Sequence, residues 1–401
     1  MSGFSVANAR QDTTTQRARD FSIDYLRTAL TLLVIAHHSA MAYTSWASFN
    51  PKAPLLSTSP IVDPARWAGF DIFINFNDVF FMSLMFFISG LFVYPVLRRQ
   101  GPARFIQDRL LRLGVPFVGA VVVLIPLAYY ASWQLAGRPE GYGEYYGQLA
   151  RGGFTVGPPW FIWVLLLFDV VVALIAWPLR DWLPRLAPAL ARLRLRPVAA
   201  AAAATGLAVA VYYPAVVRYG PSAWTVLFTS PFAFQMARLG LYALWFSFGF
   251  LMGLNGLISG LLAPDGHLAR RWPWWVGASL LAYLALWFIP RTAHLQHLVP
   301  GWRQLVESLL LVASCVASCF ASLALFRGVR MPSRPWMNSL SRSAYVMYLV
   351  HYVFLCWLQL LVLPWPLAVG LKFGFVLLAT TFLSWLTAQG LLRVPKLKDI
   401  L

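Results

Sequence analysis

Charged residues are scarce in this sequence, and their scarcity argues against a soluble protein. Only 11% of the 401 residues are charged and 59% are apolar, whereas about a quarter of a typical soluble domain is charged. Cysteine is also rare, with Cys315, Cys319 and Cys356 all lying in apolar segments. This excludes a disulfide framework and favours small apolar side chains that fill space. Zinc, P-loop, dinucleotide and nucleophile-elbow motifs are absent, so we expect no metal site and no permanently bound cofactor.

Apolar runs close to the length of a membrane-spanning helix recur along the chain. The strict apolar–polar alternation of a membrane β-barrel is missing, which leaves the α-helix as the spanning element. The sequence therefore predicts an all-α, polytopic integral membrane helix bundle with about ten transmembrane helices. We expect these helices at 22–44, 74–96, 113–134, 160–178, 198–217, 236–259, 273–290, 304–326, 343–363 and 366–390.

The distribution of basic residues predicts how the chain is oriented. With the N-terminus placed in the cytoplasm, most of the 32 Lys and Arg residues fall in cytoplasmic segments, as the positive-inside rule requires. The net charge of +18 is therefore attributed to topology and anionic lipid, not to nucleic acid. We expect a cytoplasmic polar tail at 1–20 without a signal peptide, a transmembrane domain at 21–392 and a cytoplasmic basic tail at 393–401.

The first expected helix carries a stripe of polar side chains. Ten residues separate Arg27 from His38, so the two lie about 20° apart around the helix axis and about 16 Å apart along it. Asp24 and Thr31 fall near the same line, while His37 lies about 100° away. Ionisable groups within a membrane are costly and are by default functional candidates. A titratable base deep in the helix and a cation near its cytoplasmic end indicate a channel with an anion anchor, although a structural interhelical hydrogen bond is the alternative.

Other polar residues interrupt the apolar segments. Glu307 is expected at a depth comparable with that of His38, and His351 near the middle of the ninth helix. Ser89 adjoins Gly90, where small residues allow close helix packing. Arg109 and Arg112 share one helix face and are able to hold phosphates, but membrane topology alone also explains them. The loops at 45–73 and 135–159 are long enough to form the walls of a binding site.

Four stretches, taken in order, resemble the membrane-bound acyltransferase 3 family. "FSIDYLRTALTLLVIAHH" is similar to the family's first helix, in which a basic residue precedes a histidine with ten residues between them. "FFISGLF" with "RLLRLGVP" resembles the second helix and the basic loop after it. "PPWFIWVLLLF" and "LSRSAYVMYLVH" are similar to two later helices. Each motif alone is loose, but the ordered set covers nearly the whole chain, and further details resemble the glucan-modifying branch of the family.

The resemblance implies O-acylation of an extracytoplasmic glycan in a bacterial cytoplasmic membrane. Acyl-CoA, carrying an acetyl or succinyl group, is the implied donor and a carbohydrate the acceptor. In the mechanism it suggests, His38 is the general base, and Glu307 and His351 assist it. The phosphates of coenzyme A are assigned to Arg27, Arg109, Arg112 and Arg342. Substrate contacts are assigned to Asp24, Ser89, Trp160, Tyr345 and Tyr348.

Two observations keep other possibilities open. Family members often have His-Leu before the Trp-Phe pair, whereas this chain has Pro158 and Pro159 before Trp160, which puts the acceptor contact there in doubt. The same buried His, Arg and Glu residues also suit a proton-coupled transporter of an anionic metabolite. A transporter moves its substrate unchanged, whereas an acyltransferase frees a thiol from coenzyme A.

Overall fold

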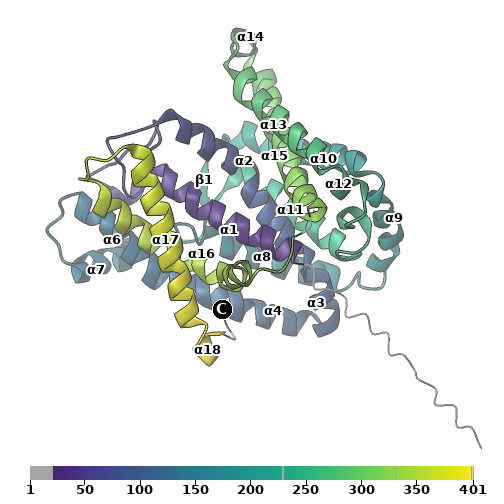
Figure 1. Ribbon diagram of the computed structural model, residues 1–401, viewed down its shortest axis with the longest axis horizontal. Coiled ribbons are helices and arrows are strands. Elements are labelled where there is room, and N and C mark those ends of the chain that lie inside the picture. Colours follow the sequence, from purple (N-terminus) through teal and green to yellow (C-terminus); the bar gives the residue numbers. More distant parts are fainter. Residues whose placement is uncertain (1–20, 228–229, 330, 399, 401) are drawn as a thin grey trace, which may run out of the picture.

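The computed structural model describes all residues except 1–20, 228–229, 330, 399 and 401. The expected N-terminal tail at 1–20 therefore lies outside the described residues. The described chain is helical apart from one short antiparallel hairpin, β1 (Trp224–Val226) paired with β2 (Ala233–Gln235). The longer helices, shown in Figure 1, are α1 (Ser22–Met41), α2 (Ala68–Leu91), α6 (Ile125–Leu135), α7 (Tyr142–Gly152), α8 (Trp160–Ala176), α10 (Pro197–Tyr219), α11 (Met236–Gly253), α13 (Trp272–Phe288), α15 (Pro300–Gly328), α16 (Pro335–Val362) and α17 (Val369–Leu391). The shorter ones are α3 (Val93–Gln100), α4 (Pro102–Arg109), α5 (Val115–Gly119), α9 (Ala187–Ala191), α12 (His267–Arg270), α14 (Ala293–Gln296) and α18 (Pro395–Lys398).

Eight helical segments of the described chain are long and apolar enough to cross a membrane, two fewer than expected. They are Ala68–Gln100, Pro102–Leu135, Pro197–Tyr219, Met236–Gly253, Trp272–Arg291, Pro300–Gly328, Pro335–Val362 and Val369–Leu391. The two expected spans outside this set are α8 and α1. α8 has only 17 residues, so it is about 25 Å long, somewhat less than the hydrocarbon core of a bilayer. α1 has 20 residues, but its polar stripe and paired histidines lower its hydropathy.

α1 lies in the middle of the bundle, as Figure 1 shows, in contact with α2, α15, α16 and α17. Thr31 on the expected polar stripe is 3% exposed, and Val34 and Ile35 beside it are buried. Interhelical contacts therefore cover most of α1, and Thr31 and His37 are buried within the bundle, whereas Arg27 is exposed near the start of the helix. This placement makes these polar side chains available to cavities within the bundle.

α2 and α11 pack with their backbones in direct contact. A Cβ atom on Gly90 of α2 would overlap the carbonyl oxygen of Phe246, and one on Gly249 of α11 would overlap that of Phe87. Only glycine allows this approach, which confirms the close packing that Gly90 suggested. The contact fixes the position of α2, which carries several of the polar side chains described below.

The helix from Pro102 to Leu135 is interrupted by two π-helical turns, Leu110–Gly114 and Ala120–Leu124. Pro116 has no backbone N–H with which to bond the carbonyl of Arg112, four residues earlier. The Arg112 carbonyl instead accepts a hydrogen bond from the hydroxyl of Tyr345, at 2.9 Å. The irregularity therefore ties this helix to α16 beside the candidate site.

The segment between α1 and α2 is held against the bundle by two cations. Lys372 of α17 donates to the carboxylate of Asp63 at 2.7 Å, and both side chains are almost completely buried. Arg66 donates to the backbone carbonyls of Thr44, Ser45 and Ala47. These contacts hold the segment over the end of α1, where it forms one wall of a cavity.

Candidate active site

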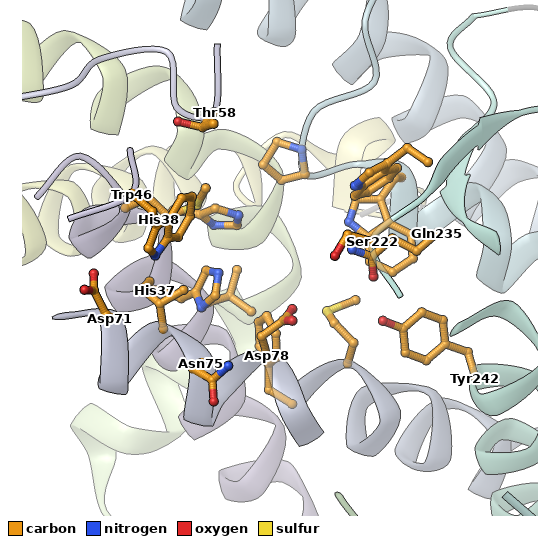
Figure 2. A pocket seen from close by; sticks show the side chains of 18 of the residues that line it. His37, His38, Trp46, Thr58, Asp71, Asn75, Asp78, Ser222, Gln235 and Tyr242 are labelled. Atoms are coloured by element: carbon orange, nitrogen blue, oxygen red, sulfur yellow. The ribbon is translucent and has the colours of Figure 1, made fainter. Parts of the chain in front are cut away.

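The larger of two polar cavities has a volume of about 960 Å³ and opens beside the end of α1. Its walls include residues from both loops that were expected to form a site, at 45–73 and 135–159. Figure 2 shows the imidazoles of His37 and His38 directed into this space, with Asp78 below them and Tyr242 opposite. The other polar residues of the lining come from α2, the α1–α2 segment and the hairpin region, and include Asp71, Asn75, Ser57, Thr58, Ser222, Gln235 and Arg291.

His38 belongs to a chain of hydrogen bonds that determines which of its nitrogens is free. His351 Nδ1 lies 2.7 Å from the carbonyl oxygen of Tyr348, so Nδ1 carries the proton and donates it. His351 Nε2 lies 3.2 Å from His38 Nδ1, and in the neutral ring it accepts. His38 Nδ1 is therefore the donor, which leaves the lone pair on His38 Nε2. Such a nitrogen is the atom that a general base requires.

Tryptophans line the same cavity from four parts of the chain. Trp46 and Trp224 are about half exposed, and Trp160 and Trp287 contribute partly buried faces. Trp160 lies edge-on to Trp224, with ring centroids 5.8 Å apart. Flat aromatic faces beside hydrogen-bonding groups suit a ligand with both apolar faces and hydroxyl groups.

A second cavity of about 300 Å³, the arginine cavity, lies farther along α1. Arg27, Arg112 and Arg342 line it from α1, the first π-helical turn and α16. Arg27 pairs with Asp24 at 3.6 Å, whereas Arg112 and Arg342 have no ion-pair partner within the described residues. Three guanidinium groups with so little neutralisation favour an anionic ligand. Thr31, Ser89 and Tyr345 complete its polar lining.

Tyr348 lies between the two cavities. Of the described residues, it alone lines both. Its hydroxyl donates to the carbonyl of Pro158, which also lines the larger cavity, and its ring centroid is 5.9 Å from that of His351. Tyr348 is therefore the wall residue that the arginine cavity and the larger cavity have in common.

Comparison with known proteins shows the family of the chain. The profile of the family described as acyltransferase domain (acyltransferase 3) matches residues 20–389. The chain belongs to the acyltransferase 3 family. Among curated proteins it is similar to glucans biosynthesis protein C of Escherichia coli SMS-3-5, with 25% identity over 164 residues that cover 40% of this chain and 38% of the relative. The same protein from Escherichia coli O1:K1 and O157:H7 matches with the same identity and coverage.

The similarity to those relatives is distant and partial, since the match spans 38% of their length. No solved structure matches the chain. The acyltransferase 3 assignment therefore rests on the family profile, which covers nearly all of the described residues.

Most of the residues expected at the site lie in the two cavities. His38, Trp160 and Tyr348 line the larger cavity, and Tyr348 is shared with the arginine cavity. The arginine cavity also holds Arg27, Ser89, Arg112, Arg342 and Tyr345. His351 is completely buried and reaches the site through His38, and Asp24 does so through Arg27.

Two expected residues lie elsewhere. Glu307 does not contact His38; its carboxylate accepts a hydrogen bond from Arg303, one turn earlier in α15, at 2.9 Å. Similar depth in the membrane was the basis for pairing Glu307 with His38, and depth does not determine which face of α15 a residue occupies. Arg109 is paired with the buried Asp169 of α8 at 3.3 Å, so this guanidinium joins two helices and does not line the arginine cavity.

The polar face of α2 was not identified from the sequence. Asp71, Asn75 and Asp78 are spaced by four and three residues, which places them on one helix face, and all three line the larger cavity. Asp71 accepts hydrogen bonds from the backbone N–H and the hydroxyl of Ser45. Asp78 pairs with Arg238 of α11 at 2.6 Å. The spacing was visible in "DIFINFND" and is the signal that would have revealed them.

Proposed function

We propose that this acyltransferase 3 protein is a membrane O-acyltransferase that moves an acetyl or succinyl group from cytoplasmic acyl-CoA to a hydroxyl group of an extracytoplasmic glycan. One observation carries the proposal: Arg27 and His38, toward opposite ends of α1, line two different cavities that share Tyr348 as a wall residue. A two-chamber site of this kind suits a reaction whose donor and acceptor approach from opposite sides.

The arginine cavity is assigned to the donor. Arg27, Arg112 and Arg342 bind phosphate groups of coenzyme A, because guanidinium groups form charge-assisted hydrogen bonds with phosphate oxygens. The pantetheine arm then extends along α1 past Thr31 and Tyr348. The rise of α1 between Arg27 and His38 is about 16 Å, a span that an extended arm is long enough to cover. The thioester carbonyl is thereby delivered to His38.

The larger cavity is assigned to the acceptor. The tryptophan faces pack against the C–H faces of sugar rings, and Asp71, Asn75 and Gln235 bind hydroxyl groups. His38 Nε2 removes the proton from the reacting hydroxyl as its oxygen attacks the thioester carbonyl. His351 keeps His38 in the required tautomer, in the way that a buried partner orients the histidine of a hydrolase triad. The C–S bond then breaks, and the imidazolium returns its proton to the sulfur.

The same proposal places the chain in the bilayer. α1 and α8 join the eight candidate spans, which gives ten crossings of the bacterial cytoplasmic membrane with both termini in the cytoplasm. The basic loops then face the cytoplasm and anionic lipid. The residues from 21 to 392 act as one transmembrane unit, followed by the short basic tail at 393–401.

Release of free thiol is the direct test. The native chain in lipid nanodiscs is mixed with acetyl-CoA or succinyl-CoA and linear glucan oligosaccharides, beside His38→Ala, Arg27→Ala and the control Arg180→Ala. Arg180 is an exposed residue that pairs with Asp181 and lines neither cavity. We expect glucan-dependent thiol release that falls by about 10²- to 10⁴-fold in His38→Ala, a raised KM for the donor in Arg27→Ala, and native activity in Arg180→Ala.

Two outcomes would contradict the proposal. Equal rates for the native chain and His38→Ala would remove the base from the mechanism. Movement of an intact anionic metabolite across the vesicle membrane, without thiol release from either thioester, would favour the proton-coupled transporter.

A further inference from the structure

His37 is the second imidazole in the larger cavity, and its surroundings differ from those of His38. The side chain is 7% exposed and stacks on Phe81 of α2, with ring centroids 5.0 Å apart. Its Nδ1 is buried and has no hydrogen-bond partner within the described residues. Figure 2 shows the ring directed into the cavity that it lines. Because Nδ1 is enclosed, we infer that Nε2 is the nitrogen open to this cavity. Apart from this stacking and the nearby carboxylate of Asp78 (Figure 2), the described residues offer no side-chain hydrogen bond that accounts for a polar ring at this buried position.

The unpartnered nitrogen indicates where the proton of neutral His37 lies. A buried N–H without an acceptor is rarer in proteins than a buried acceptor without a donor. The favoured tautomer therefore leaves the lone pair on the enclosed Nδ1 and places the hydrogen on Nε2, which opens into the cavity. His37 consequently presents a hydrogen-bond donor to any ligand there.

His37 and His38 thus present opposite hydrogen-bonding groups, a donor and an acceptor, to one cavity. The hydrogen bonds to His351 leave a lone pair on His38 Nε2, whereas His37 directs an N–H into the same space. The two rings are nearly perpendicular, with centroids 5.4 Å apart. A reacting group between them meets an acceptor on one side and a donor on the other.

We propose that His37 is a further catalytic residue, whose Nε2–H donates a hydrogen bond to the oxyanion formed during acyl transfer. This inference rests on the acyltransferase function proposed above. As the acceptor oxygen bonds to the thioester carbon, its proton passes to His38 Nε2 and the C=O electron pair moves to the carbonyl oxygen. His37 stabilises that negative charge. When the carbonyl re-forms, the C–S bond breaks and the sulfur takes the proton from His38.

Three substitutions of His37 separate catalysis from packing. A Gln side chain places its amide nitrogen near the position of histidine Nε2, whereas the shorter Asn places it near Nδ1. We therefore expect His37→Gln to retain kcat within about tenfold of the native value. His37→Asn and His37→Leu should lose about 10²- to 10³-fold in kcat, the usual effect of removing one oxyanion donor. KM for succinyl-CoA and for glucan oligosaccharides should change little, because the donor bond forms mainly in the transition state.

The measurement is steady-state thiol release by each variant in nanodiscs, with thermal unfolding as a check on folding. Native kcat in His37→Leu, or an equal loss in His37→Gln and His37→Asn, would overturn the role of His37. The acyltransferase proposal would survive either result, provided that the native chain is active and His38→Ala is not. An inactive native chain would instead overturn the acyltransferase proposal, and the assignment of His37 would fall with it.

Discussion

The tautomer of His38 depends on His351, a residue that lines neither of the two cavities. His351 is 0% exposed and connects the backbone of α16 to His38 through its two ring nitrogens. In the proposed mechanism His351 is a positioning residue, which acts by keeping the proton of His38 on Nδ1. Outer-shell partners of this kind commonly change activity by about 10- to 100-fold when they are removed.

Replacement of His351 tests that role. In His351→Leu, His38 loses its acceptor, and we expect kcat to fall by about 10- to 100-fold while KM for acyl-CoA stays near its native value. The amide oxygen of His351→Gln replaces the accepting Nε2 and should restore most of kcat. Steady-state kinetics of the two variants measure the difference. Equal losses in both would show that His351 serves only to pack α1 against α16.

Replacement of Arg112 is expected to change the donor KM, whereas replacement of His351 is expected to change kcat. Its guanidinium lines the arginine cavity without an ion-pair partner among the described residues, so its assigned contact forms before the chemical step and persists through it. Loss of one such charged hydrogen bond costs about 1.5–3 kcal/mol. We expect Arg112→Ala to raise the donor KM by roughly tenfold to a hundredfold with kcat unchanged.

The control for that prediction is Arg180→Ala, measured by the same kinetics at two salt concentrations. The effect of Arg112→Ala should diminish as salt screens the phosphate contact, and Arg180→Ala should leave the donor KM unchanged. A fall in kcat with native KM in Arg112→Ala would contradict the assignment of this cavity to the donor.

At the scale of elements, the crossing of α2 and α11 requires glycine on both helices. A methyl group at position 249 would overlap the backbone of Phe87, and a rigid backbone cannot move aside as a side chain does. Gly249→Ala should therefore lower the free energy of unfolding by about 1–3 kcal/mol. Gly206→Ala in α10 is the matched control, because no atom lies within 4 Å of its added Cβ. Thermal unfolding of both variants in the same lipid measures the difference in stability. Equal shifts in the unfolding temperature would contradict the role given to Gly249.

The ion pair between Asp63 and Lys372 holds the α1–α2 segment, and with it one wall of the larger cavity. In Lys372→Met, Asp63 remains buried without a cation, so we expect a loss of about 3–5 kcal/mol in the free energy of unfolding. Adding Asp63→Asn to that variant removes the uncompensated charge and should recover much of the loss. Chemical unfolding of the single and double variants measures this. A double variant no more stable than the single one would contradict the explanation.

The elements themselves were largely predictable, whereas their partners were not. The apolar runs predicted most helices to within several residues, because length and composition alone decide whether a segment can cross a membrane. The period of the helix also placed Arg27 and His38 on one side of α1. The contact of His38 with His351 joins residues 313 positions apart, and helix period within one segment carries no information about such a pair.

The misplaced Glu307 and the overlooked polar face of α2 have the same physical origin, namely the packing of separate segments against one another. Depth along the helices suggested a contact between Glu307 and His38, but packing decides which face of α15 meets α1. The spacing of Asp71, Asn75 and Asp78 was readable from the sequence, yet the cavity they line forms only when α2, the α1–α2 segment and the hairpin come together. The roles of these residues in catalysis stay predictions until activity is measured.

At the scale of the whole molecule, the two cavities explain why a transferase would be built within a bundle. Acyl-CoA and a glycan are both polar and neither crosses a bilayer unaided. A site that admits them at different ends allows the acyl group alone to pass between compartments. Tyr348, the shared wall residue, lies at the point where the acyl group would cross.

The central claim is tested most directly by the sidedness of transfer in sealed proteoliposomes. Succinyl-CoA with a radiolabelled succinyl group is supplied outside, and glucan oligosaccharides are either trapped inside or supplied outside. We predict labelled glucan only when donor and acceptor are on opposite sides, whatever the orientation of the protein, and none with His38→Ala. Equal labelling when both substrates are outside would contradict the two-chamber account.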